Sequence, residues 1–318
     1  MKTQDIQDRI TISRLTPKFA LELAPVFRSN SEDTSVLRVG LIYKILESVK
    51  LLPHATKLVA YHTEDKVAAG FITLEKNTKT LFSIKDVFVD PRYRRMGIAS
   101  RLLDYAITLA KEKGAKKLNL NVDPSKTNVI QLYNGLGFRE IGYTRLILGF
   151  LSGYSPSKII KRTILGQRLP RRAENAQKSR LVELSKFGQS GEKLFDIYQN
   201  CVGKDWLDFF EINSKNFGNG SRHVWYPNFF KDSLIGDSDD NFALIFNQPY
   251  PPKDTVELYR GANGAALPLL EDLLEILSNR GTGLTHIWLF GKTDDIPLDW
   301  LKEKEMMTFS FVGMGKIL

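Results

Sequence analysis

The stretch that decides the fold is SIKDVFVDPRYRRMGIASRLLDYAITLAKEKG, residues 83–114. Its first part, SIKDVFVD (83–90), has the apolar, β-branched and aromatic composition of a strand. A short loop, PRYRRMG, leads into a helix predicted from Ile98 to about Lys113 and ended by Gly114. Apolar residues recur in it at helical spacing and mark a buried face: Leu102, Leu103, Ala106, Leu109 and Ala110.

The loop predicts an anion site. Backbone N–H groups at a helix N-terminus have no intrahelical partner, and the helix dipole favours negative charge there. Gly97 and the small Ala99 would let a pyrophosphate approach the backbone, and Arg94 and Arg95 would add charge-assisted contacts. Taken alone, a glycine between a strand and a helix is equally typical of a plain structural turn.

The rest of the first half alternates between strand and helix patterns. We expect a β-α-α-β-β opening, then the unit above, a strand at KKLNLNV (116–122), a short helix from Asn128 to Leu136 closed by Gly137, and a last strand or strand pair between Phe138 and Phe150. The opening elements are predicted at 10–15, 19–27, 39–49 and in 57–76, where the turn His62 to Lys66 joins two strands.

The pattern R-x-x-G-x-A after a strand ending in VFVDPRYR, with NVIQLYNGLGF about thirty residues downstream, resembles the GNAT superfamily of N-acetyltransferases. In element order the resemblance covers roughly residues 10–150. It implies acetyl-CoA as the cofactor. The position of Ala99 is often Gly in that family, a variation that it tolerates.

The resemblance also implies roles by position. Backbone groups of Val87, Phe88 and Val89 would pair with the pantetheine arm like an added strand. The run Arg94, Arg95, Met96, Gly97, Ile98, Ala99 and Ser100 would hold the pyrophosphate. Asn128 would help hold the cofactor arm, although a helix N-cap explains its position equally well.

Tyr133 matches the family's tyrosine near the thioester sulfur, where a phenol with a pKa of about 10 can protonate a departing thiolate. The alternative is that Tyr133 packs as an aromatic beside Leu132 and Leu136. The acceptor amine must lose a proton before it attacks, and Asp86 or Asp123 could relay that proton through water. Either carboxylate could instead be an ordinary solvated residue at a strand end.

Length and composition limit the number of domains and the kinds of site that the chain can contain. The 318 residues suit two domains of about 150 residues each. The single cysteine, Cys201, excludes an intrachain disulfide and a cysteine-based metal cluster, and the four histidines have no metal-ligand spacing, so we expect no metal. The start has no signal-peptide pattern, and no apolar run is long enough for a membrane span. We therefore expect a cytoplasmic protein with no membrane partner.

The second half repeats the order of the first. Laying Leu102-Leu103 on Leu269-Leu270 places Gly97 on Gly264 and Arg94 on Gly261, and the element order of the repeat places Leu301, within one residue of that register, at the position of Tyr133. The second half therefore has neither the arginine pair nor a tyrosine at that position that could act as the general acid. The aromatic residues between Trp206 and Phe230 are interpreted as core rather than as an acceptor-binding wall.

These observations predict an α+β protein with a GNAT-like mixed twisted sheet flanked by helices, in two such domains in tandem. The predicted domains are a catalytic domain at 1–155, a basic linker at 156–180 and a degenerate copy at 181–318. The predicted function is direct acetyl transfer from acetyl-CoA to an amine acceptor, a small molecule or a peptide, by a monomer or a homodimer.

Two alternatives stay open. The first is a non-catalytic CoA-binding regulatory module. The second is an RNA-associated acetyltransferase, which the net charge of +9 favours although no nucleic-acid-binding motif accompanies it.

Overall fold

The computed structural model divides the chain into two compact units. Unit 1 contains residues 1–121, 128–139 and 315–318, and unit 2 contains 122–127 and 140–314. The two expected helices at 19–27 and 39–49 and the predicted linker at 156–180 lie outside the residues that the structure describes. The described residues are 9–15, 55–150, 182–183, 191–214, 230–236, 242–247, 254–260, 266–279, 284–291, 296–304 and 306–318.

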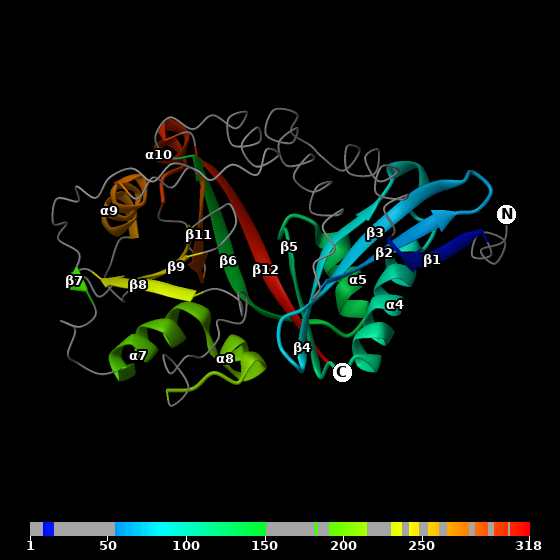
Figure 1. The fold of residues 1–318 in the computed structure, drawn as a ribbon, viewed down its shortest axis with the longest axis horizontal. Helices are drawn as coiled ribbons and strands as arrows, with labels where there is room; N and C mark the ends of the chain where they lie inside the picture. The colour runs from blue at the N-terminus through cyan, green and yellow to red at the C-terminus, as the bar shows by residue number, and fades with distance from the viewer. Residues whose placement is uncertain are drawn as a thin grey trace. The chain divides into compact units, whose positions relative to one another are not determined.

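Unit 1 is built on five strands in the order β1-β2-β3-β4-β5 (Figure 1). The first three pairings are antiparallel and the pairing of β4 with β5 is parallel. The elements are β1 (Ile10–Arg14), β2 (Ala55–His62), β3 (Val67–Lys76), β4 (Leu81–Val89), the 3-10 turn η1 (Pro91–Tyr93), α4 (Ile98–Glu112), β5 (Lys117–Val122) and α5 (Thr127–Gly135). Each lies within one or two residues of its expected bounds, except η1, which was not expected.

Helix α4 covers the sheet with the face that its spacing predicts. All five expected apolar residues are buried, and Leu102, Leu103, Ala106 and Ala110 are fully so. The helix approaches β3 closely at Gly70, where a Cβ atom would lie 3.0 Å from Ile98 and 3.1 Å from Leu102. The absence of a side chain at Gly70 thus allows α4 to lie close against β3.

Unit 2 repeats this plan. Its strands follow the order β7-β8-β9-β10-β11, with three antiparallel pairings and then a parallel one, and α9 lies between β10 and β11 along the chain as α4 lies between β4 and β5. The elements are β7 (Val182–Glu183), α7 (Gly191–Val202), α8 (Lys204–Phe210), β8 (Phe230–Gly236), β9 (Phe242–Asn247), β10 (Asp254–Tyr259), α9 (Ala266–Asn279), β11 (Leu284–Phe290) and α10 (Leu298–Glu303). Strand β8 was not expected from the sequence.

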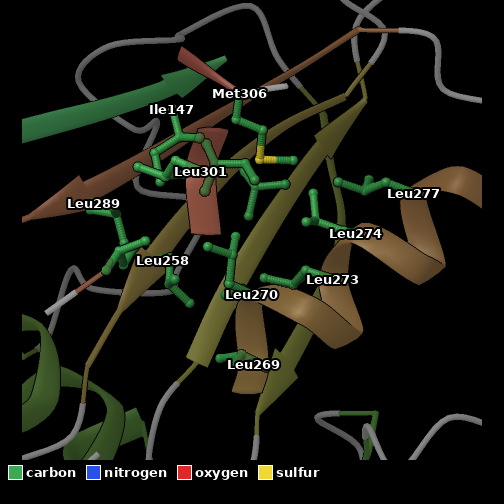
Figure 2. Packing of buried hydrophobic residues seen from close by; sticks show 14 residues of the cluster. Ile147, Leu258, Leu269, Leu270, Leu273, Leu274, Leu277, Leu289, Leu301 and Met306 are labelled. Atoms are coloured by element: carbon green, nitrogen blue, oxygen red, sulfur yellow. The ribbon is translucent and has the colours of Figure 1, made fainter. Parts of the chain in front are cut away.

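The core of unit 2 is formed around α9. Leu269, Leu270, Leu273, Leu274 and Leu277 face the sheet, with Leu301 of α10 in the same cluster (Figure 2). The carbonyls of Leu301 and Tyr133 each accept a hydrogen bond from the N–H five residues later, at Met306 and Phe138, as do carbonyls at the ends of α4 and α8. Trp206 and Phe209 are buried as expected, whereas Trp225, Tyr226 and Phe229 lie outside the described residues.

The two remaining strands, β6 and β12, pair with strands that are distant from them in the sequence. Strand β6 (Arg139–Phe150), which follows unit 1 along the chain, pairs antiparallel with β11, from Thr144–Phe290 to Phe150–Leu284. Strand β12 (Met307–Ile317) is the other neighbour of β6, and Arg145 Nε donates to Thr308 Oγ1 at 2.8 Å. The last residues, Gly315–Leu318, belong to unit 1.

Candidate active site

The pairing of β4 with its neighbour β5 stops in the middle of the strand. Parallel pairing with β5 joins Leu81–Ser83 to Lys117–Asn119, and within the described strands it extends no further although both strands continue. Opposite β3, the register shifts between Phe71 and Thr73, so β4 carries one extra residue at Asp86–Val87. Asp86 has φ 54, in the left-handed region. The bulge redirects β4 where it parts from β5.

A buried polar cluster marks the point of divergence. Ser83 Oγ donates to Asn119 Oδ1 at 2.7 Å, across the last paired residues, and accepts from Asn77 Nδ2 at 2.8 Å. All three side chains are buried, so these bonds form in a low dielectric and define the register. Sequence reasoning missed this cluster because a Ser and an Asn in alternating strand positions are also typical of a solvated face.

The loop after β4 is held by its own first residue. Asp90 is buried and caps η1: its Oδ1 accepts from Arg92 N at 2.9 Å, and its Oδ2 accepts from Arg92 Nη2 at 2.9 Å. The hydrogen bonds from the Arg92 side chain lower the pKa of Asp90 most. Burial acts in the opposite direction, but the bond from the Arg92 backbone N–H lowers the pKa further, so it lies below its ordinary value. Arg92 is thus a structural partner of Asp90.

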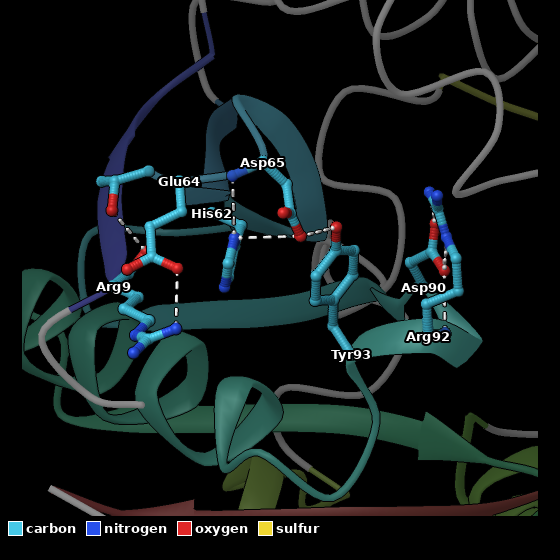
Figure 3. Close-up of polar contacts among 8 residues, drawn as sticks. Arg9, His62, Glu64, Asp65, Asp90, Arg92 and Tyr93 are labelled. Atoms are coloured by element: carbon cyan, nitrogen blue, oxygen red, sulfur yellow. Dashed lines mark hydrogen bonds and ion pairs between the residues drawn. The ribbon is translucent and has the colours of Figure 1, made fainter. Parts of the chain in front are cut away.

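The middle of the loop is anchored on the β2–β3 turn (Figure 3). Tyr93 is buried, its hydroxyl donates to Asp65 Oδ2 at 2.5 Å, and its ring lies 5.0 Å from that of His62. Burial, with the Asp65 contact second, raises the pKa of Tyr93 to about 12. His62 Nδ1 accepts from Asp65 N at 3.2 Å, which holds the turn itself. The loop therefore leaves β4 with a fixed geometry.

The predicted anion cradle follows directly. Arg95 (φ 66) and Gly97 (φ 74) both have left-handed backbone conformations, which turn the chain sharply into α4. Arg94 and Arg95 are exposed; Arg94 Nε donates to Val89 O at 3.4 Å, and Arg95 makes no ion pair with any described residue. No side chain caps α4, and the first intrahelical bond is Arg101 N to Gly97 O at 3.0 Å.

The cradle fits a pyrophosphate. The N–H groups of Ile98, Ala99 and Ser100 have no acceptor within the helix, as at any helix start. A Cβ atom at Gly97 would meet no described residue within 4 Å, so no described side chain fills the space beside the loop. Met96, Ala99 and Ser100 are half-buried, and Ile98 is buried beneath the turn. Unsatisfied donors and two exposed arginines suit a doubly charged anion.

Helix α5 carries the other two predicted residues. It begins at Thr127, so Asn128 lies one residue inside the first turn and is exposed there. Tyr133 is the buried residue of the helix, 4% exposed, and its ring meets Phe138 edge-on with centroids 6.0 Å apart. Among the described residues its hydroxyl has no hydrogen-bond partner. Burial raises the pKa of Tyr133 to about 12.

The two carboxylates that sequence reasoning proposed as proton relays differ. Asp86 is half-buried at the bulge, within unit 1, and accepts from Thr73 Oγ1 at 3.4 Å. Asp123 belongs to a segment of unit 2 and accepts from the Ser125 N–H and hydroxyl, at 2.8 and 2.7 Å. Burial alone would raise the pKa of Asp123, but the Ser125 bonds and the charge of Lys126 leave it lowered. Asp123 thus has a local structural role.

Strand β5 holds two further polar groups that sequence reasoning missed. Asn119 Nδ2 and Asn121 Oδ1 are buried and have no hydrogen-bond partner among the described residues. Both lie at or beyond the point where β5 parts from β4. Buried amide atoms without a protein partner are usually satisfied by water or a ligand. The alternating pattern LNLNV was the available signal, since it puts both asparagines on one face.

Within the described part of the chain, no group of three His, Cys, Asp or Glu residues could hold a metal ion. None of the helices described there is long and apolar enough to cross a membrane.

Comparisons with known proteins agree with this geometry. Residues 24–138 match the acetyltransferase (GNAT) family. The chain is 40% identical over 76 residues to the [ribosomal protein bS18]-alanine N-acetyltransferase of Escherichia coli, which covers 24% of this chain and 49% of that protein. It is 32% identical over 77 residues to an uncharacterized N-acetyltransferase of Methanocaldococcus jannaschii, covering 22% and 34%. The chain thus spans about a third to a half of the length of these curated relatives.

A solved structure resembles nearly the whole chain. The GCN5-related N-acetyltransferase from Sphaerobacter thermophilus has a TM-score of 0.54 and 15% identity, covering 98% of this chain and 96% of the other. At that identity the likeness concerns the fold alone, a mixed sheet flanked by helices. The family match therefore concerns residues 24–138, and it identifies that segment of the chain as a GNAT acetyltransferase domain.

Proposed function

We propose that the protein moves an acetyl group from acetyl-CoA to an amine acceptor, and that unit 1 carries the reaction. The observation that supports this best is the divergence of β4 from β5 immediately before the cradle loop. Peptide-like groups can pair with a strand edge as an additional strand does. The edge formed by Val87, Phe88 and Val89 leads directly to Arg94–Ser100, so one extended ligand can contact both.

Each part of the site has a role in binding. The amides and carbonyls of Val87–Val89 would hold the pantetheine arm, and Arg94, Arg95 and the first N–H groups of α4 would hold the pyrophosphate. Asn128, exposed at the start of α5, would bond to the arm from the other side. Bound in this way, acetyl-CoA supplies the activated thioester, and the protein contributes alignment of the amine with its carbonyl carbon.

Tyr133 has the chemistry to assist the departing thiolate. In direct transfer, the amine nitrogen forms a bond to the carbonyl carbon and the C–S bond breaks, with no covalent enzyme intermediate. With a pKa of about 12, Tyr133 is protonated at neutral pH but is a weaker acid than an ordinary phenol. We therefore assign it a hydrogen bond to the sulfur, which stabilises the negative charge as it develops.

The acceptor amine must lose a proton, and Asp86 is our candidate to receive it through water. The bulge places this carboxylate on β4, one residue before the segment assigned to the pantetheine arm. Its left-handed backbone conformation costs free energy, and such strain is concentrated at functional sites. Asp123 is the weaker candidate because Ser125 already occupies its carboxylate.

We propose a primary or secondary amine as the acceptor class and residues 1–155 as the catalytic part of the chain. The bS18-alanine N-acetyltransferases among the relatives make a peptide N-terminus beginning with alanine the first acceptor to test. Residues 181–318 are proposed to be a degenerate copy that binds no acetyl-CoA. Unit 2 does not reproduce the divergence: β10 and β11 pair from Asp254–Thr285 to Leu258–Leu289.

The test is release of free CoA thiol from acetyl-CoA in the presence of a panel of amines. The panel contains small amines, amino acids and short peptides with free or blocked N-termini. We expect turnover with at least one free amine, none with the blocked peptides, and none in the Arg94→Ala/Gly97→Asp double variant. Mass spectrometry of the acceptor should show a gain of one acetyl group.

The outcome also separates this function from a regulatory module. Tight binding of acetyl-CoA with no thiol release across the panel would contradict the proposed activity and favour a CoA sensor. Release that persists in the double variant would mean that the cradle is not where the cofactor binds.

A further inference from the structure

Helix α5 lacks a cation of its own at its C-terminal end. Its last turn contains no basic residue, although the final carbonyls of any helix are unsatisfied and carry partial negative charge. Leu136, just after the helix, is one of the carbonyls that need a donor. Because α5 carries both Asn128 and Tyr133, whatever stabilises this end also affects the proposed reaction centre.

Two cations from outside the helix serve this end: Arg139 Nη1 donates to Asn134 O at 3.4 Å, and the second cation comes from the last strand of the sequence. Lys316 Nζ, on β12, donates a hydrogen bond to the Leu136 carbonyl oxygen. The same nitrogen lies 6.0 Å from the centroid of the Phe138 ring, within range of a cation–π contact. Leu318 N donates to Lys116 O at 2.9 Å, so the backbone next to Lys316 is tied to the start of β5. All these residues belong to unit 1.

Gly137 makes room for this arrangement. Its φ of 84 disfavours any side chain, and a Cβ atom at this position would lie 2.7 Å from Lys316 Nζ. The ammonium group therefore occupies the space that a side chain would fill. Gly137 in the pattern GLGF therefore does two things: it follows the end of α5, and it leaves space for the side chain of a lysine 179 positions later.

The contact reaches Tyr133 through one intermediate ring. Phe138 is fully buried, bonds through its N–H to Tyr133 O at 3.0 Å, and meets the Tyr133 ring edge-on. Lys316 touches Phe138 and the carbonyl that follows α5. A change at Lys316 therefore alters the support of Tyr133 without removing any group that would touch acetyl-CoA.

We propose that Lys316 is a positioning residue for the transferase site, acting on Tyr133 through the end of α5. The proposal rests on the proposed function for its kinetic part. The second half of the sequence then contributes to catalysis through one side chain, although it has no cofactor site of its own. Lys316 stabilises the place of the helix and takes no part in proton transfer.

The experiment compares Lys316→Met, which keeps the length and apolar stem of the side chain, with Lys316→Arg. Lys79→Met, at an exposed site in the β3–β4 turn, is the control for loss of one positive charge. The free energy with which a partly buried cation stabilises a helix C-terminus corresponds to about five- to twentyfold in an equilibrium constant, and we expect the rate to reflect a loss of that size. We expect kcat of Lys316→Met to fall by that factor, with KM for acetyl-CoA within about twofold, and Lys316→Arg to recover most of the rate.

Two further measurements isolate the mechanism. In a Tyr133→Phe background, Lys316→Met should cost less than about twofold, because residues that act through one another are not additive. Hydrogen exchange of the α5 amides should be faster in Lys316→Met than in Lys79→Met and does not depend on turnover. Equal exchange and equal kcat in these two variants would overturn the proposal. A wild-type chain that transfers no acetyl group contradicts the proposed function instead, and exchange alone then decides the role of Lys316.

Discussion

Strands β4 and β10 occupy the same position in the strand orders of the two units, yet among the described pairings of these two strands it is β4 that shows a register shift. In unit 1 the pairing with β5 covers three residues, and a bulge at Asp86 follows. In unit 2, β10 pairs with β11 over five residues and with β9 over six, without a register shift. Strand β10 thus pairs regularly with both of its neighbours, whereas the parallel pairing of β4 with β5 ends at Ser83.

The comparison shows that the two units share a strand order and differ in the local geometry of one strand. Leu269 and Leu270 are as deeply buried as Leu102 and Leu103, so the helix after the parallel strand packs equally well in both units. What differs is local: one extra residue in β4, and the two arginines of the loop that follows it. Stability and binding are therefore separable in this fold, and each variant below tests one of them.

The largest effect is expected from Gly97→Asp. Asp tolerates the left-handed backbone conformation better than most residues, and a Cβ meets no described residue within 4 Å, so the fold should persist. Two like charges about 4 Å apart repel by about 4 kcal/mol at an effective dielectric of about 20, or about a thousandfold in affinity. Calorimetry with acetyl-CoA should show that loss. The matched Gly264→Asp variant should bind normally, and an equal loss there would contradict the difference between the units.

Leu103→Ala and Leu270→Ala compare the two cores. Both side chains are fully buried, and truncation of such a leucine costs about 3 kcal/mol through lost transfer free energy and a cavity. Urea unfolding of the chain should show similar destabilisation for both. At low temperature, where both variants are folded, Leu270→Ala should keep the wild-type Kd for acetyl-CoA. A weakened Kd would mean that the unit 2 core also supports the site.

Tyr133→Phe tests the chemistry. Removing one hydrogen-bond donor to developing charge costs about a hundredfold in kcat, whereas KM for acetyl-CoA should change little. With a pKa of about 12, Tyr133 stays protonated up to about pH 11, so the wild-type rate should not fall from its ionisation between pH 7 and 10. Stopped-time assays across that range check both statements. Unchanged kcat would leave Tyr133 as a packing residue against Phe138.

The smallest effect is expected from Asp90→Asn. The substitution weakens the bonds to Arg92 that shape the cradle loop, at a cost of about 1 kcal/mol in folding free energy, and should raise KM for acetyl-CoA several-fold. The folded pKa of Asp90 is lowered, so its contribution is complete above the unfolded value of about 3.9 and disappears as the pH falls through the folded value. Thermal unfolding at pH 7 and pH 3 should therefore differ less in the variant. If the variant and the wild type lose the same stability between pH 7 and pH 3, Asp90 does not contribute to that loss.

Most helices and strands of unit 1 could be predicted from local sequence patterns, and the features that could not be predicted have physical reasons. The buried face of α4 followed from the spacing of five apolar residues, and the cradle followed from glycine next to a helix start. The pairing of β6 with β11 could not be predicted, because the strand's alternation gives no partner. The bulge at Asp86 was missed because the segment KDVFV has ordinary strand composition.

The same limit applies to the site. Val87–Val89, Arg94–Ser100, Asn128 and Tyr133 all lie in unit 1, on the elements that the motifs indicated. Asp90, Tyr93 and Asp65 were missed because a loop anchor depends on contacts between segments 28 positions apart. Lys316 was missed for the same reason, since its partner Leu136 is 180 positions away.

The central claim is that the chain has one acetyl-CoA site, at the divergence of β4 from β5. Calorimetric titration of the whole protein with acetyl-CoA tests it most directly, beside the Gly97→Asp and Gly264→Asp variants. We predict one site per chain, lost in Gly97→Asp and kept in Gly264→Asp. Two sites per chain, or one site that survives in Gly97→Asp, would contradict the claim and place a binding edge outside unit 1.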